Sequence, residues 1–225
     1  MTALTRAAPI DVETGPSPRA AVIWLHGLGA DGHDFEPIVP EMQLPAGTPI
    51  RFVFPHAPMR PVTVNNGMVM RAWYDVVIAG GRRQEDEPGV RESDRQIQAL
   101  MARERERGVP ASAMFLFGFS QGGAMALTTG VRYPERLGGI AALSCFLPLA
   151  DKIAAEASPA NRDVPIFMAH GTHDPMIPLD RGAQARDNLV ALGYRAEWHE
   201  YRMPHSVCAE EIADLSAWLG RLLPR

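Results

Sequence analysis

Short apolar runs alternate along this chain with longer segments in which apolar residues recur at helical spacing. Buried strands are expected at 20–25, 50–54, 114–117, 139–143 and 165–169, and a further strand is expected near 195–201. Helices are expected at 34–42, 93–107, 121–133, 179–192 and 212–222. Because short apolar strands alternate with helices, the pattern predicts an α/β fold with a mainly parallel central sheet covered by helices on both faces.

Residues 55–93 interrupt this alternation. Prolines, an Asn-Asn-Gly turn signal and a polar run at 82–87 predict a long irregular segment, with 80–87 flexible and solvated. Its apolar island at 68–74 makes Met70 and Trp73 candidate substrate contacts, with packing beneath the loop as the alternative. A capping-box pattern at 93–96 is expected to begin the next helix.

Composition and charge narrow the class of protein. The 225 residues are 46% hydrophobic and 21% charged, which predicts one soluble globular domain over residues 1–225. With 22 basic and 26 acidic residues the net charge is −4, so nucleic acid is not an expected partner. Neither a secretory signal nor a membrane span is recognised, which predicts a cytoplasmic protein without stable membrane insertion. Two cysteines are too few for a disulfide framework.

The most informative stretch is Gly118-x-Ser120-x-Gly122, which follows the apolar run at 114–117 and precedes an Ala-rich helix. A sharp strand-to-helix turn can present a serine hydroxyl to a base, and the N–H of Gln121 at the helix start can face an oxyanion. Ser120 is therefore a candidate nucleophile. The alternative is an ordinary glycine-rich turn with an N-cap serine.

A second glycine-rich loop follows the strand at 20–25. Hydrolases with a nucleophile elbow place their second oxyanion donor in such a loop, and here the candidate is the N–H of Leu28. The spacing Gly27-x-Gly29-x-x-Gly32 also fits a dinucleotide-binding loop. The hydrolase interpretation is favoured because the turn at Ser120 explains the loop without a nucleotide.

Two later loops supply the partners that a serine nucleophile needs. In this fold class the chain order is Ser, acid, His, which nominates Asp174 and His205 at the ends of successive strands. Asp180 is the alternative acid, but it is expected inside the following helix. The cluster His170-x-x-His173-Asp174 has no third histidine or cysteine at a ligand-like spacing nearby, so no metal is expected. A Ser-His-Asp mechanism requires no cofactor, so none is expected.

Together these segments resemble the carboxylesterase/phospholipase branch of the α/β-hydrolases, which contains the acyl-protein thioesterases. The matching segments are His26-Gly27-Leu28-Gly29-Ala30-Asp31-Gly32, Phe54-Pro55-His56-Ala57-Pro58 with Arg60-Pro61-Val62-Thr63 and Asn65-Asn66-Gly67, Trp73-Tyr74-Asp75, Gly118-Phe119-Ser120-Gln121-Gly122-Gly123, His170-Gly171-x-x-Asp174 and His205-Ser206-Val207. The resemblance implies an α/β-hydrolase fold without a large cap domain, a Ser120-Asp174-His205 triad, an oxyanion hole at Leu28 and Gln121, and a possible homodimer.

The function expected from these residues is a serine carboxylesterase that acts on a small-molecule or lipid ester through an acyl-enzyme intermediate. The alternatives are an acyl-protein thioesterase or a lysophospholipase, which differ in leaving group and acyl length. A non-catalytic acyl-binding module is a further alternative, but it would be expected to have a broken triad.

Overall fold

A seven-stranded sheet forms the centre of the protein in the computed structural model, which describes residues 7–45, 47–79 and 82–224. The strand order is β1-β3-β2-β8-β9-β10-β11. The strands are β1 (Ile10–Glu13), β2 (Ala20–Leu25), β3 (Ile50–Phe54), β8 (Met114–Phe119), β9 (Gly139–Leu143), β10 (Ile166–Gly171) and β11 (Ala196–Tyr201). All neighbouring strands run parallel except β1, which pairs antiparallel with β3 in a register that places Ile10 opposite Phe54.

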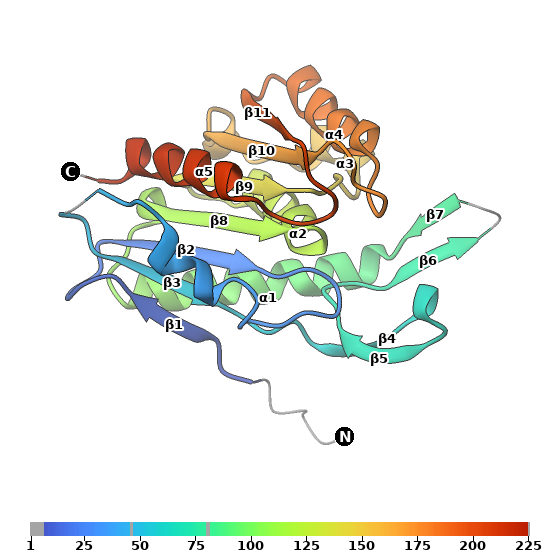
Figure 1. The fold of residues 1–225 in the computed structure, drawn as a ribbon, viewed down its shortest axis with the longest axis horizontal. Coiled ribbons are helices and arrows are strands. Elements are labelled where there is room, and N and C mark those ends of the chain that lie inside the picture. Colours follow the sequence, from blue (N-terminus) through green and yellow to red (C-terminus); the bar gives the residue numbers. More distant parts are fainter. Residues whose placement is uncertain (1–6, 46, 80–81, 225) are drawn as a thin grey trace.

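The central strands are buried on both faces, as expected for a parallel sheet covered on both sides. Every residue of β2, β3, β9 and β10 is buried. The helices are α1 (Glu87–Glu106), α2 (Gln121–Arg132), α3 (Ala150–Glu156), α4 (Leu179–Ala191) and α5 (Ala209–Leu222). Helices α1 and α2 lie behind the sheet and α5 lies in front of it (Figure 1). Within the described part of the chain, none of these helices is both long enough and apolar enough to cross a bilayer.

Short 3₁₀ helices connect several of these strands and helices. The 3₁₀ helices are η1 (Glu36–Glu41), η2 (Thr63–Asn65), η3 (Ala111–Ala113) and η4 (Pro159–Asn161). The segment expected to be a helix at 34–42 is η1, and Pro40 within it removes a backbone donor that a longer helix needs. Strand β1 was not predicted because its alternation of apolar and polar residues covers only four positions, and helix α3 was not predicted because it has only seven residues.

The prediction of an irregular segment over 55–93 is wrong. This region contains two antiparallel hairpins, β4 (Met59–Val62) with β5 (Met68–Arg71) and β6 (Val76–Ala79) with β7 (Arg82–Glu85). Both hairpins extend beyond the edge of the sheet at which the central strands end (Figure 1). The turn signal at 65–67 connects β4 and β5, with Asn66 and Gly67 at φ 55° and 73°. Of the predicted flexible stretch, residues 80 and 81 lie outside the described residues.

Helix α1 begins six residues before the predicted capping box. Its N-cap is Asp86, whose side chain accepts a hydrogen bond from the backbone N–H of Gly89. Ser93 lies inside the helix, fully buried, and its hydroxyl donates to the carbonyl oxygen of Trp73. The hydroxyl therefore holds the segment before β6 against α1 instead of capping a helix.

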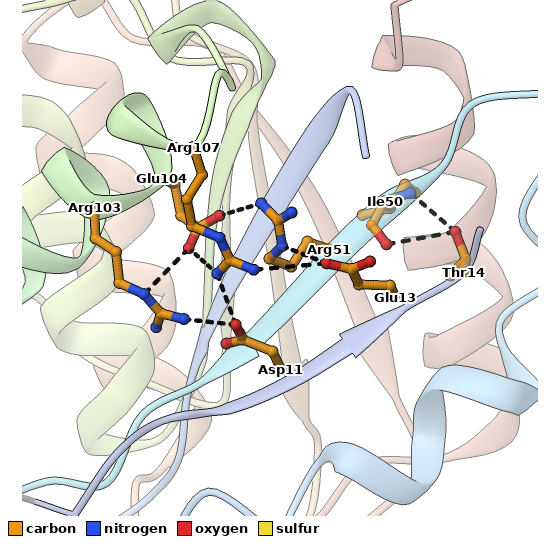
Figure 2. A network of polar contacts seen from close by, with 8 residues as sticks. All are labelled: Asp11, Glu13, Thr14, Ile50, Arg51, Arg103, Glu104 and Arg107. Carbon is orange, nitrogen blue, oxygen red and sulfur yellow. Dashed lines mark hydrogen bonds and ion pairs between the residues drawn. The ribbon is translucent and has the colours of Figure 1, made fainter. Parts of the chain in front are cut away.

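A polar network fixes the N-terminal strand to α1 (Figure 2). The Arg51 guanidinium on β3 donates to Glu104 on α1 and to Glu13 on β1, each at 2.8 Å. Arg103 and Arg107 both donate to Asp11, each at 2.6 Å. The Glu104 side chain is completely buried, so this cluster pairs a carboxylate that would be costly to bury alone.

Candidate active site

Ser120 lies in a tight turn between β8 and α2. Its backbone has φ 55° and ψ −120°, a conformation that non-glycine residues rarely adopt. The two flanking glycines are required by close approaches: a Cβ on Gly118 would lie 2.2 Å from the carbonyl oxygen of Gly122, and one on Gly122 would lie 2.1 Å from that of Leu25. The motif therefore folds as the sharp strand-to-helix turn predicted from its spacing.

The structure brings together the three residues predicted to form a triad. Nε2 of His205 lies 2.9 Å from Oγ of Ser120, and Nδ1 of His205 lies 2.6 Å from Oδ2 of Asp174. If Nδ1–H donates to the carboxylate, Nε2 is left to accept the hydroxyl proton of Ser120. This geometry can activate the serine hydroxyl as a nucleophile.

Asp174 is held by the loop that carries it. Its Oδ1 accepts hydrogen bonds from the backbone N–H groups of Met176 at 2.8 Å and Ile177 at 2.9 Å, and its side chain is fully buried. Asp180, the alternative acid, is exposed in the first turn of α4. The placement favours Asp174 as the partner of His205.

Sequence reasoning missed two contacts of the triad. The ring of Phe119 packs against the His205 imidazole with centroids 4.7 Å apart. The buried His170 places Nε2 3.6 Å from Oδ2 of Asp174 while donating to the carbonyl oxygen of Ile177 at 2.8 Å. The contact of Phe119 could have been predicted from the sequence, because this residue directly precedes Ser120. The position of His170 depends on tertiary packing and could not.

A cleft of about 600 Å³ opens above Ser120 and His205. Most of its lining side chains are apolar: Leu28, Ala30, Val64, Met70, Val76, Ile78, Phe119, Phe146, Met176 and Ile177. Val64 and Ile78 come from the region of the two hairpins and remain 41% and 56% exposed. The volume and apolar lining suit a small or extended apolar ligand.

The remaining predicted site residues divide into two groups. Leu28, Gln121 and Met70 line the cleft with Ser120. Trp73 does not: it is 1% exposed and packs beneath the loop, so the prediction that it contacts substrate is wrong. An aromatic side chain such as Trp73 packs readily into the core. The neighbouring sequence alone does not distinguish a tryptophan in the core from one that lines a cleft.

The histidines near Asp174 in the sequence make separate contacts in the structure. Across residues 7–45, 47–79 and 82–224, no group of three or more His, Cys, Asp or Glu side chains is placed to hold a metal ion. His170 and His173, which stood close to Asp174 in the sequence, point to different partners: His170 bonds the Ile177 carbonyl and His173 lies beside the Thr172 hydroxyl.

Comparison with known proteins identifies the family of this chain. The family model for phospholipase/carboxylesterase matches residues 10–223. The chain belongs to the phospholipase/carboxylesterase family. It is a serine hydrolase with the α/β-hydrolase fold, which confirms the fold and enzyme class expected from the sequence.

The chain is similar to fungal and plant proteins. The chain is 37% identical over 233 residues to acyl-protein thioesterase 1 of Mycosarcoma maydis, covering 96% of each chain. It is 38% identical over 235 residues to acyl-protein thioesterase 1 of Neurospora crassa, covering 100% of this chain and 96% of the relative. The crystal structure of Arabidopsis thaliana SOBER1 superposes with a TM-score of 0.85 at 34% identity, covering 92% of this chain and 100% of that one. Zea mays acyl-protein thioesterase 2 gives a TM-score of 0.81 at 27% identity, covering 96% and 99%.

Proposed function

We propose that this protein is an acyl-protein thioesterase in which Ser120 is the nucleophile, His205 the general base and Asp174 the residue that orients His205. The observation that carries the proposal is the continuous hydrogen-bonded chain from Ser120 through His205 to Asp174 at the floor of an apolar cleft. The relatives named acyl-protein thioesterase favour this activity over the generic carboxylesterase expected first from the sequence.

In the proposed reaction, Nε2 of His205 takes the proton of Ser120 as Oγ attacks the thioester carbonyl carbon. The oxyanion of the tetrahedral intermediate is stabilised by the N–H groups of Leu28 and Gln121. As the C–S bond breaks, His205 returns the proton to the departing thiolate. Water, deprotonated by His205, then hydrolyses the Ser120 ester and releases the fatty acid.

The cleft supports an acyl group as the recognised part of the substrate. Met70 lines it, with its thioether sulfur receiving a hydrogen bond from Asn65 Nδ2 at 3.2 Å. Val64, Ile78 and Met176 present exposed apolar side chains to it. We propose that Met70 and these residues contact the acyl chain, because a flexible thioether adapts to chains of different shape.

The leaving group and the acyl length are tested together. Hydrolysis is measured on one peptide acylated at a cysteine or, in the matched compound, at a serine, with acetyl, octanoyl and palmitoyl groups, and on a palmitoyl lysophospholipid. A thioesterase is expected to give its highest kcat/KM with a long-chain S-acyl peptide. A preference for the acetyl serine ester would instead favour a carboxylesterase, and turnover confined to a lysophospholipid would favour a lysophospholipase.

The cytoplasmic location and the homodimer expected from the sequence stay predictions.

A further inference from the structure

Trp73 contacts both segments that carry the proposed oxyanion donors. Its indole Nε1 donates to the carbonyl oxygen of His26, two residues before Leu28, at 2.9 Å. Its backbone N–H donates to Oε1 of Gln121 at 2.8 Å, and Nε2 of Gln121 donates to the carbonyl oxygen of Tyr74 at 2.7 Å. Trp73 and Gln121 are 1% and 3% exposed, so water does not substitute for these bonds.

The loop that carries Leu28 is held on both sides of that residue. The carbonyl of Gly27 and the N–H of Leu28 belong to one peptide plane, and Nδ1 of His26 lies 2.7 Å from that carbonyl oxygen. Beyond Leu28, the N–H of Gly29 donates to the carbonyl oxygen of Arg71 at 2.9 Å. The orientation of the Leu28 N–H therefore depends on His26 and on the segment at 71–74.

The protonation state of His26 allows it to donate a hydrogen bond to the Gly27 carbonyl. The backbone N–H of Ala57 donates to Nε2 of His26 at 3.0 Å, which leaves Nδ1 to carry the proton and donate to Gly27. Burial lowers the pKa of His26 to about 4, so the ring is neutral near pH 7. A neutral ring keeps both the acceptor toward Ala57 and the donor toward Gly27.

We propose that Trp73 is a positioning residue for the oxyanion hole, which fixes the Leu28 loop relative to the start of α2. This inference rests on the proposed function, because it concerns the same reaction. Trp73 does not touch the cleft; it acts through the His26 carbonyl and the Gln121 side chain. The hydroxyl of Ser93 on α1 donates to the Trp73 carbonyl and holds the tryptophan from a third direction. Preorganised donors stabilise the transition state more than the bound substrate, so their displacement lowers kcat more than it raises KM.

The chain offers a matched control for the indole N–H. Trp24 on β2 is also 1% exposed, and among the described residues its Nε1 has no hydrogen-bond partner. Trp73→Phe and Trp24→Phe each shorten a buried indole, but only the first removes a hydrogen bond to the oxyanion loop. We expect Trp73→Phe to lower kcat about 10- to 100-fold with KM changed less than about twofold. Trp24→Phe should keep the kinetic constants of the wild type.

A transition-state analogue separates positioning from a general loss of structure. An alkyl trifluoromethyl ketone forms a hemiketal with Ser120 whose oxygen occupies the oxyanion hole. Its inhibition constant should rise in Trp73→Phe by the same factor as kcat/KM falls, while both tryptophan variants unfold at similar temperatures. Gln121→Met, which keeps the backbone N–H but removes both side-chain bonds, should act in the same direction. Equal kinetics in Trp73→Phe and Trp24→Phe, or a change in KM alone, would overturn the inference.

An ester-hydrolysis assay distinguishes failure of this inference from failure of the proposed function. Hydrolysis of p-nitrophenyl acetate by the wild type is compared with that by Ser120→Ala before the tryptophan variants are interpreted. Loss of turnover in Ser120→Ala together with unchanged turnover in Trp73→Phe would reject only the positioning role. Turnover retained in Ser120→Ala would reject the proposed chemistry, and with it the role of Trp73.

Discussion

Oδ2 of Asp174 lies 2.6 Å from Nδ1 of His205, and both groups stand on loops that follow neighbouring parallel strands, β10 and β11. The other carboxylate oxygen is occupied by two backbone N–H groups of the Asp174 loop. The carboxylate is therefore fixed before substrate binds, and it can set both the tautomer and the orientation of the imidazole.

Asp174→Asn should lower kcat about 10⁴-fold, because an amide can stabilise the wrong tautomer of His205 and does not stabilise the imidazolium that forms during attack. KM should change little, since Asp174 does not line the cleft. The measurement is steady-state hydrolysis of an acyl thioester by Asp174→Asn and by Asp180→Asn, whose exposed carboxylate lies outside the triad. A larger loss in the Asp180 variant would show that the acid has been misassigned.

Gly122→Ala should destabilise the fold as well as abolish activity. The new Cβ would lie 2.1 Å from the carbonyl oxygen of Leu25, so the elbow or β2 must move. We expect a loss of about 3 kcal/mol or more in the free energy of unfolding, measured in urea. In the control Gly15→Ala, the new Cβ would meet only Pro49 side-chain atoms at 3.4 Å. This substitution should change the free energy of unfolding by about 0.5 kcal/mol or less. Similar stabilities for the two variants would contradict the close packing at the elbow.

Glu211 in the first turn of α5 makes stability depend on pH. Burial raises its pKa from 4.5 to about 8, and among the described residues neither carboxyl oxygen has a hydrogen-bond partner. Between these values the folded state keeps the proton and the unfolded state releases it. The contribution of the neutral carboxyl to stability is therefore complete below pH 4.5 and is lost as the pH rises to about 8.

Glu211→Gln removes this titration. The free energy of unfolding of the variant, relative to the wild type, should increase across that pH range by about 2 to 5 kcal/mol and then level off. The exposed neighbour Glu210 provides the control, because Glu210→Gln should give no such rise. A difference between Glu211→Gln and the wild type that is constant with pH would mean that the buried carboxyl is already ionised in the folded state.

The buried pair Arg51 and Glu104 should contribute more to stability than an exposed pair. Glu104→Gln leaves the Arg51 guanidinium, 8% exposed, without one of its two carboxylate partners (Figure 2). We expect a loss of about 2 kcal/mol or more in the free energy of unfolding. Glu197→Gln, which breaks a pair with the 57% exposed Arg221, should cost about 1 kcal/mol or less. Equal effects would show that the network in Figure 2 is no stronger than a surface ion pair.

The sequence predicted the parts of the fold that depend on a strong local pattern. The apolar runs at 20–25, 50–54 and 139–143 are the strands β2, β3 and β9 with the same bounds. Chain order and loop position were enough to select His205 and Asp174, because consecutive parallel strands end at the same edge of a sheet. These features follow from periodicity and topology, which are visible in one sequence.

The parts that were missed depend on contacts between distant residues. The hairpins in 55–93 lack a long apolar alternation, and apolar residues of their strands are exposed: Met59, Met68, Val69 and Ile78. Ser93 was predicted to cap a helix, but its hydroxyl donates a hydrogen bond to the carbonyl oxygen of Trp73, twenty residues earlier. The buried position of Trp73 likewise depends on hydrogen bonds to His26 and Gln121 that no local pattern encodes.

The assignment of Ser120 as the nucleophile is tested most directly by the rate of thiol release from an S-palmitoylated peptide. Wild type and Ser120→Ala are compared at the same enzyme concentration, with circular dichroism showing that the variant is folded. We predict that kcat falls by about 10⁴-fold or more in Ser120→Ala, because only binding and the oxyanion hole remain. A folded Ser120→Ala enzyme that releases thiol at the wild-type rate would contradict the proposed mechanism.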